Sequence, residues 1–170
     1  MNRSVTNDIS EFDSKDRLSS WIDTVHSCES VEATYRLAGR LAHNLQEGDI
    51  LCLDGPLGAG KTHFVKGLAA ALGIEPETVH SPTFTLIHEY KAGKLPLYHF
   101  DFYRIKNCHE ALDIGVEDYF YGDGICCIEW PDQITPILPD HALWLQIESV
   151  SATTRKIIIS ARNHSGREVE

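Results

Sequence analysis

The stretch that decides the fold is residues 50–62, which read ILCLDGPLGAGKT. Its first four residues are apolar, as expected of a strand that is buried on both faces of a sheet. The last eight match G-x-x-x-x-G-K-[ST] at every position, which is the pattern of a phosphate-binding loop, or P-loop. An Ala- and Leu-rich run from Thr62 to Leu72 then predicts a helix that Gly73 and Pro76 end. In this strand–loop–helix order, backbone N–H groups and the helix dipole favour a bound phosphate.

The chemistry that this motif predicts needs a lysine, a hydroxyl and a carboxylate. Lys61 is expected to reach the β- and γ-phosphates of a nucleotide, and the Thr62 hydroxyl to bind Mg²⁺. Two acids end apolar runs: Glu129 follows ICCI in the manner of a Walker B motif, and Asp101 follows LYHF. Ligands of α/β sheets bind beyond the carboxyl ends of the strands, so either acid could serve the metal.

The remaining sequence favours adenine over guanine and offers no acceptor site for a kinase. The guanine-reading motif Asn-Lys-x-Asp does not occur after the P-loop. Small-molecule kinases generally carry several lid arginines there, whereas Arg104 is the only arginine between Arg40 and Arg155. We therefore predict that ATP is the nucleotide.

The rest of the chain predicts a three-layer α/β fold of the P-loop NTPase type. Its central sheet is expected to be mixed, parallel around the P-loop and antiparallel elsewhere. Ser30 is predicted to cap a helix, and a second helical stretch is expected to break at Gly115. The predicted helices are 31–45, 62–72 and 108–120, and the predicted strands are 21–26, 50–53, 84–90, 97–101, 125–129, 143–148 and 155–161. The predicted domains are a flexible extension (1–20), a single ATPase domain (21–163) and a tail (164–170).

Composition limits the range of functions. The 170 residues suffice for one domain, and 25 acidic against 15 basic residues leave a net charge of −10. An acidic chain of this size is a poor candidate for direct contact with a nucleic acid backbone. Five cysteines without a CxxC pair and nine histidines without HExxH argue against a zinc site. Short apolar runs and an acidic, polar N-terminus predict a cytoplasmic protein with no membrane segment.

Four motifs carry a resemblance to a known family: GPLGAGKTHF (55–64), SPTFTL (81–86), HFDFYR (99–104) and IEWP (128–131). In this order and spacing they resemble the motifs of the bacterial TsaE (YjeE) family, over residues 30–161. The resemblance implies a small, weak Mg²⁺-dependent ATPase that is required for threonylcarbamoylation of adenosine 37 (t6A) in tRNAs reading codons that begin with A. It also implies TsaB and TsaD as partners, with tRNA reached only through that complex, and TsaC as the source of threonylcarbamoyl adenylate.

The resemblance also implies roles for single residues. Lys61 and Thr62 are expected to hold the phosphates and the metal, and Glu129 to be the direct Mg²⁺ ligand. Asp101 is similar to the family's catalytic acid near the γ-phosphate, and Trp130 to the aromatic residue beside the site. The catalytic candidates are thus Lys61, Asp101 and Glu129; the metal candidates are Thr62 and Glu129; and the nucleotide-binding candidates are Gly55, Pro56, Leu57, Gly58, Ala59, Gly60, Lys61, Thr62, His63, Thr34, Trp130 and Arg155.

The sequence departs from the family pattern at two positions. Pro56 stands where the family usually has Asp, and His63 replaces a common Thr. Because the phosphate-facing N–H groups come mainly from residues 58–62, nucleotide binding is expected to survive the proline. His63, a lone histidine on a helix, is expected to be structural rather than catalytic. Residues 81–83 look like a switch-type loop in this comparison.

Three functions remain open from the sequence. The first is a weak ATPase subunit of a tRNA-modifying complex, which suits an acidic surface and the lack of an acceptor-binding lid. The second is a nucleotide-gated binding module in which ATP orders an interface and hydrolysis is incidental. The third is a small-molecule kinase, for which no acceptor site can be named.

Overall fold

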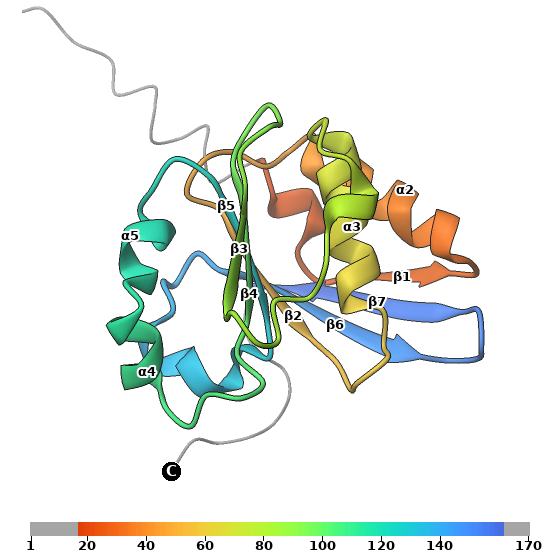
Figure 1. Ribbon diagram of the computed structural model, residues 1–170. Helices are drawn as coiled ribbons and strands as arrows, with labels where there is room; N and C mark the ends of the chain where they lie inside the picture. Colours follow the sequence, from red (N-terminus) through yellow and green to blue (C-terminus); the bar gives the residue numbers. More distant parts are fainter. Residues whose placement is uncertain (1–16, 162–170) are drawn as a thin grey trace, which may run out of the picture.

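The computed structural model describes residues 17–161, and residues 1–16 and 162–170 lie outside the described part of the chain. A seven-stranded sheet in the order β1-β7-β6-β2-β5-β4-β3 forms its centre (Figure 1). The strands are β1 Thr24–Cys28, β2 Ile50–Asp54, β3 Ile87–Tyr90, β4 Leu97–Asp101, β5 Ile125–Glu129, β6 Leu143–Ser149 and β7 Arg155–Ser160; the α-helices are α2 Val31–Ala42, α3 Lys61–Ala71, α4 Cys108–Asp113 and α5 Val116–Phe120; and the 3-10 helices are η1 Ser19–Trp21, η2 Pro76–Thr78 and η3 Pro131–Ile137.

The sheet is parallel at its centre and antiparallel at both ends. β2 pairs in parallel with β5 and β6, and β5 pairs in parallel with β4. The pairs β1–β7, β6–β7 and β3–β4 are antiparallel. The parallel strands β2, β4 and β5 therefore end at one edge, where the P-loop leaves β2 for α3. This arrangement confirms the predicted mixed α/β sheet.

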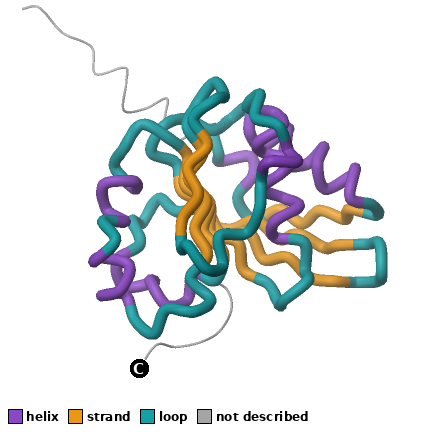
Figure 2. The backbone as a smooth tube through the Cα atoms, in the orientation of Figure 1, coloured by secondary structure: helices purple, strands orange, loops and turns teal. Residues whose placement is uncertain are grey.

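Two hydrophobic clusters fill the space between the layers. α2 and α3 cover one face of the sheet, and α4 and α5 cover the other (Figures 1 and 2). Successive residues of β2 alternate between the clusters: Leu51 and Leu53 belong to the one beneath α2 and α3, and Ile50 and Cys52 to the other. Both sides of β2 are therefore buried, which accounts for its continuous apolar sequence.

Three predicted elements differ from the structure. The first strand covers Thr24–Cys28 rather than 21–26, because η1 precedes it, and α2 ends at Ala42 rather than at residue 45. The strand predicted for 84–90 begins only at Ile87. A turn closed by the Leu86 N–H and the Pro82 carbonyl (2.8 Å) replaces its first half. This turn leaves the Phe84 side chain 82% exposed.

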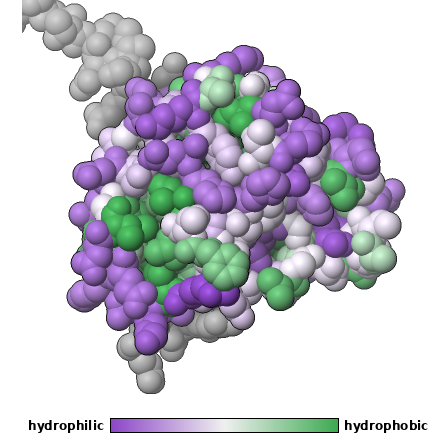
Figure 3. Space-filling view, viewed as in Figure 1, coloured by the Kyte–Doolittle hydropathy of each residue, from purple (hydrophilic) through white to green (hydrophobic). Residues whose placement is uncertain are grey.

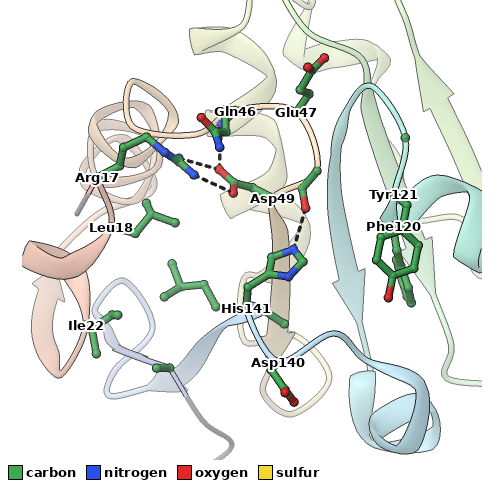
Figure 4. A pocket seen from close by; sticks show the side chains of 15 residues that line it. Arg17, Leu18, Ile22, Gln46, Glu47, Asp49, Phe120, Tyr121, Asp140 and His141 are labelled. Carbon is green, nitrogen blue, oxygen red and sulfur yellow. Dashed lines mark hydrogen bonds and ion pairs between the residues drawn. The ribbon is translucent and has the colours of Figure 1, made fainter. Parts of the chain in front are cut away.

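Residues 17–20, which the sequence predicts to be part of the flexible extension, contact the domain. The Arg17 guanidinium pairs with both carboxylate oxygens of Asp49, at 2.9 and 3.1 Å, and also donates to the Asn44 carbonyl. The Gln46 N–H donates to the same carboxylate at 2.7 Å. Arg17, Leu18, Gln46 and Asp49 line a cavity of about 710 Å³ (Figure 4). This cavity lies where β2 and β6 begin, at the opposite edge of the sheet from the P-loop.

The view in Figure 3 shows a largely hydrophilic face on which hydrophobic residues form separate small patches. Within residues 17–161, no helix is long and apolar enough to cross a bilayer.

The close approach of α2 and α3 gives a first prediction. A Cβ atom on Gly67 would lie 2.8 Å from the Ala38 Cβ and 2.9 Å from the Tyr35 Cα, both on α2. Gly67→Ala should therefore lower the free energy of unfolding, by about 1–3 kcal/mol, because the helices must move apart. Thermal or urea unfolding measures the change.

Gly39→Ala is the matched control, since this helical glycine faces the same contact with room to spare. Its added Cβ would lie 3.8 Å from the Ala71 Cβ, an ordinary contact distance. Alanine should stabilise this helix by about 0.5–1 kcal/mol through its higher helix propensity. Changes of the same sign in the two variants would contradict the described helix packing.

Candidate nucleotide-binding site

The backbone of the P-loop is shaped for an anion. Gly58 and Gly60 have positive φ angles of 78° and 103°, which residues with a Cβ adopt only with strain. α3 begins directly after Gly60, and its first bond joins the Phe64 N–H to the Gly60 carbonyl at 3.0 Å. The N–H groups of the residues between them have no acceptor within the helix, and they lie at the positive end of its dipole. This is the geometry of a phosphate-binding site.

The Lys61 side chain bends back across the loop. Its ammonium group donates to the Gly55 carbonyl at 2.6 Å and to the Pro56 carbonyl at 3.0 Å. It also lies 4.0 Å from the centroid of the Trp130 ring, a cation–π distance. Burial, with only 5% of the residue exposed, lowers the pKa of Lys61, although nearby carboxylates, Glu129 foremost, act in the opposite direction. No carboxylate of residues 17–161 forms an ion pair with this cation, which is therefore available for a phosphate.

Pro56 lacks an N–H group, but its carbonyl group helps to hold the conformation of the loop. Its carbonyl accepts both from Lys61 and from the Ala59 N–H, the latter at 3.0 Å. Gly55 and Pro56 line a separate cavity of about 680 Å³ on the other side of the loop. They contact the phosphate region through Lys61 and, from the Pro56 carbonyl, through Ala59.

Glu129 joins the two walls of the site. Its Oε1 atom accepts from the Thr62 hydroxyl at 2.9 Å and lies 2.9 Å from Nε2 of His99. Oxygen ligands of Mg²⁺ at 2.0–2.1 Å in octahedral geometry lie about 2.9 Å apart when adjacent, so Thr62 and Glu129 have a spacing that fits this ion. The described residues contain no cluster of three His, Cys, Asp or Glu side chains, the set typical of all-protein metal sites.

Asp101 holds the loop of residues 81–83 beside the site. Its Oδ2 atom accepts from the Ser81 hydroxyl at 2.7 Å and from the Thr83 hydroxyl at 3.2 Å, and its Oδ1 atom accepts from the Tyr103 N–H at 2.9 Å. Asp101 is buried, and three donors stabilise its carboxylate. It therefore connects the end of β4 to the loop that resembles a switch.

Trp130 lies in a strained backbone conformation between Glu129 and Pro131. Its φ of 57° is left-handed, and such a conformation costs a non-glycine residue of the order of 1 kcal/mol. The turn directs the indole over Lys61 and against Tyr103, whose ring centroid is 4.9 Å away. The strain thus serves to close one side of the site with an aromatic ring.

Two adjoining cavities bring most of the predicted residues together. The first, of about 360 Å³, contains the P-loop, the two acids and the indole. The second, of about 420 Å³, contains Thr34 and the start of α2. They share Gly60, His63 and Arg155, and the Arg155 Nε atom donates to the Ala59 carbonyl at 2.8 Å. The first cavity is lined by Leu57, Gly58, Ala59, Gly60, Lys61, Thr62, His63, Ser81, Thr83, Asp101, Tyr103, Glu129, Trp130 and Arg155.

Tyr103 and His99 belong to this site but have no role in the sequence-based prediction. Tyr103 lines the cavity and contacts Trp130, and His99 contacts Glu129. For His99 a signal exists in the sequence: it precedes Asp101 by two residues on the same strand, so the two share a face of the sheet. Tyr103 lies beyond the strand, where no periodicity applies.

Comparisons with known proteins agree with this architecture. The family model "Threonylcarbamoyl adenosine biosynthesis protein TsaE" matches residues 28–157. Proteins named tRNA threonylcarbamoyladenosine biosynthesis protein TsaE are similar: the Bacillus subtilis one is 45% identical (76% of this chain, 80% of that protein), and the Treponema pallidum one 40% (77% and 96%). The crystal structure of Bacillus subtilis YdiB matches with a TM-score of 0.67 at 37% identity, over 82% of this chain and 86% of that one. The chain therefore belongs to the TsaE family of threonylcarbamoyladenosine biosynthesis proteins.

Proposed function

We propose that this protein is a Mg²⁺-dependent ATPase that serves t6A formation in tRNA together with a TsaB–TsaD-type complex in the cytoplasm. The observation that carries the proposal is the meeting of Lys61, Thr62 and Glu129 with the free N–H groups at the start of α3. Phosphoryl transfer depends almost entirely on positioning and on electrostatic stabilisation of charge, and these groups supply both.

In this proposal the two adjoining cavities divide the nucleotide between them. The phosphates lie in the cavity of the P-loop, where Lys61 exchanges its two carbonyl acceptors for phosphate oxygens. The nucleoside lies in the cavity beside Thr34, and Arg155 and His63 stand at the boundary between the two. Arg155 also fixes the P-loop through the Ala59 carbonyl, so it supports the loop whether or not it touches ATP.

Thr62 and Glu129 would hold the magnesium ion through oxygen ligands. When bound there, Mg²⁺ would supply positive charge that offsets the negative charge of the phosphates. Asp101 would be the carboxylate beside the γ-phosphate. In that position it can orient or deprotonate the attacking water. Because the same carboxylate accepts from Ser81 and Thr83, a nucleotide that changed its contacts would also act on the 81–83 loop.

The surface around the site supports a protein partner. Leu57, Phe84 and Tyr103 are all exposed, and two of them line the phosphate cavity while Phe84 follows Thr83, which also lines it. Exposed apolar side chains near a site are a common feature of docking surfaces. The net charge of −10 makes direct binding of tRNA by this chain alone unfavourable. The tRNA is therefore reached through the complex.

A nucleotide-gated binding module is the second candidate. The contacts of Asp101 with Ser81 and Thr83 favour it, since they link the reacting end of the site to a surface loop. In that case ATP binding alone would change the surface, and hydrolysis would only reset it.

Lys61→Ala should reduce ATP turnover at least about 100-fold, because the variant loses the charge that stabilises the transferring phosphoryl group. Steady-state phosphate release by the full chain with Mg²⁺ measures this. Lys66→Ala is the matched control on the same helix, since Lys66 does not line the phosphate cavity. Normal turnover in Lys61→Ala would show that the P-loop is not the ATPase site.

Substitutions of Glu129 and Asp101 should have different effects on the Mg²⁺ dependence of nucleotide binding. Glu129→Gln should raise the Mg²⁺ concentration that half-saturates nucleotide binding by about tenfold or more, because a direct ligand loses its charge. Asp101→Asn should instead leave this concentration nearly unchanged and lower turnover by about 100-fold. The reverse pattern would exchange the two roles.

Binding of tRNA by the isolated chain should be weak, with a dissociation constant above about 1 μM at physiological salt, because few phosphate contacts with Lys or Arg are available. Filter binding across a salt series measures this, with ATP and Mg²⁺ present. Adding a TsaB–TsaD-type complex is the positive control and should give association that ATP strengthens. Sub-micromolar binding by the chain alone with a steep salt slope would refute the partner-dependent model.

A further inference from the structure

His99 is a buried histidine that has one polar contact among residues 17–161. It lies at the centre of β4 with 0% of its surface exposed. Its Nε2 atom is 2.9 Å from Oε1 of Glu129, and its Nδ1 atom has no hydrogen-bond partner within the described part of the chain. Carboxylate oxygens accept hydrogen bonds only, so Nε2 carries the proton and donates. Within the described part of the chain, Glu129 is therefore the hydrogen-bond partner that orients the imidazole.

The register of the sheet puts this donor beneath the metal-binding pair. Leu97, His99 and Asp101 share one face of β4, the face toward α3, because Leu97 packs in the cluster beneath that helix. β4 and β5 are parallel, with His99 opposite Cys127 and Asp101 opposite Glu129. His99 thus reaches Glu129 diagonally from below, while Thr62 reaches the same oxygen from the P-loop side.

Both donors use Oε1, and the bond from Thr62 would be lost if Thr62 and Glu129 together held a metal ion. If the Thr62 oxygen turns a lone pair toward a metal ion, its proton is directed away from that ion's other ligands. His99 is then the donor that still fixes Oε1 of Glu129. A buried nitrogen without a partner is costly, so an apolar residue would stabilise the fold better unless the imidazole has a further task.

We propose that His99 is the positioning residue of the magnesium site: its Nε2–H holds the Glu129 carboxylate in the orientation that binds the ion. The inference rests on the proposed Mg²⁺-dependent nucleotide site. Donors that orient metal-binding side chains from behind typically change metal affinity 10- to 100-fold when they are removed. His99 would act on Mg²⁺ affinity and leave the phosphate cradle untouched.

Two amide variants test the position of the donor. His99→Gln places an N–H group near the position of Nε2, whereas the shorter side chain of His99→Asn stops near that of Nδ1. Binding of a fluorescent methylanthraniloyl derivative of ATP is followed while Mg²⁺ is titrated, and again in EDTA. His99→Asn should raise the half-saturating Mg²⁺ concentration about tenfold or more, and His99→Gln should stay within about threefold of the wild type. Affinity in EDTA should be the same in all three proteins.

Tyr98→Phe controls for loss of stability on the same strand. Tyr98 is buried, and its hydroxyl donates to Asp123 at 2.7 Å, on the face away from the site. This variant should unfold at a lower temperature without any change in the magnesium titration. If folded His99→Asn had the same half-saturating Mg²⁺ concentration as the wild type, the role of His99 would be overturned while the proposed function stayed intact. A wild-type protein without Mg²⁺-dependent nucleotide affinity would refute both.

A measurement on the wild type does not depend on whether the variants fold. Long-range proton–nitrogen-15 NMR spectra distinguish the two histidine tautomers, and the signal of His99 is assigned by its absence in one variant. Nε2 should carry a proton both without ligand and with Mg²⁺ and the nucleotide bound. A His99 ring protonated at Nδ1 alone in the loaded protein would overturn the proposal.

Discussion

The parallel pairing of β2 with β5 is the constraint on which the site depends. It sets Leu53 opposite Glu129, so that the strand leading into the P-loop and the strand ending in the acid finish at the same edge. A register shift of one residue would turn Glu129 to the other face of the sheet, away from Thr62. The apolar residues of both strands, buried in two separate clusters, are what fix this register. The packing of the core therefore also determines which side chains meet at the edge of the sheet where the site lies.

The site gathers charged and polar side chains in a place where water is scarce. Lys61, His99, Asp101 and Glu129 are all buried, and each has at least one partner in the described protein. In a low-dielectric setting such groups interact more strongly with each other and with a nucleotide than they would in water. Burying these groups lowers the free energy of unfolding, and the burial of apolar side chains around them must compensate for this loss. A site of this kind is prepared before its ligand arrives, so less reorganisation is needed on binding.

Patterns within short stretches of the sequence correctly predicted those features of the structure that depend on neighbouring residues. The P-loop, the strands that end in Asp101 and Glu129, and the break at Gly115 depend on short-range rules, and all four are present in the structure. The turn at Phe84 was missed because its residues have high strand propensity, which the Leu86–Pro82 bond and the contacts of Asp101 with Ser81 and Thr83 override. The contacts of Arg17 and His99 were out of reach for a different reason. Their partners lie 32 and 30 residues away, where no periodicity connects them.

The place of β7 in the sheet sets a condition on when the protein can work. β7 lies between β1 and β6, and it is the strand with which β1 pairs. It also carries Arg155, which holds the P-loop at the Ala59 carbonyl. During synthesis on the ribosome, β1 is made first of the described strands and β7 last. A nascent chain that ends before residue 155 therefore lacks both the strand with which β1 pairs and the contact of Arg155 with the P-loop, so the nucleotide site is complete only once β7 has been made.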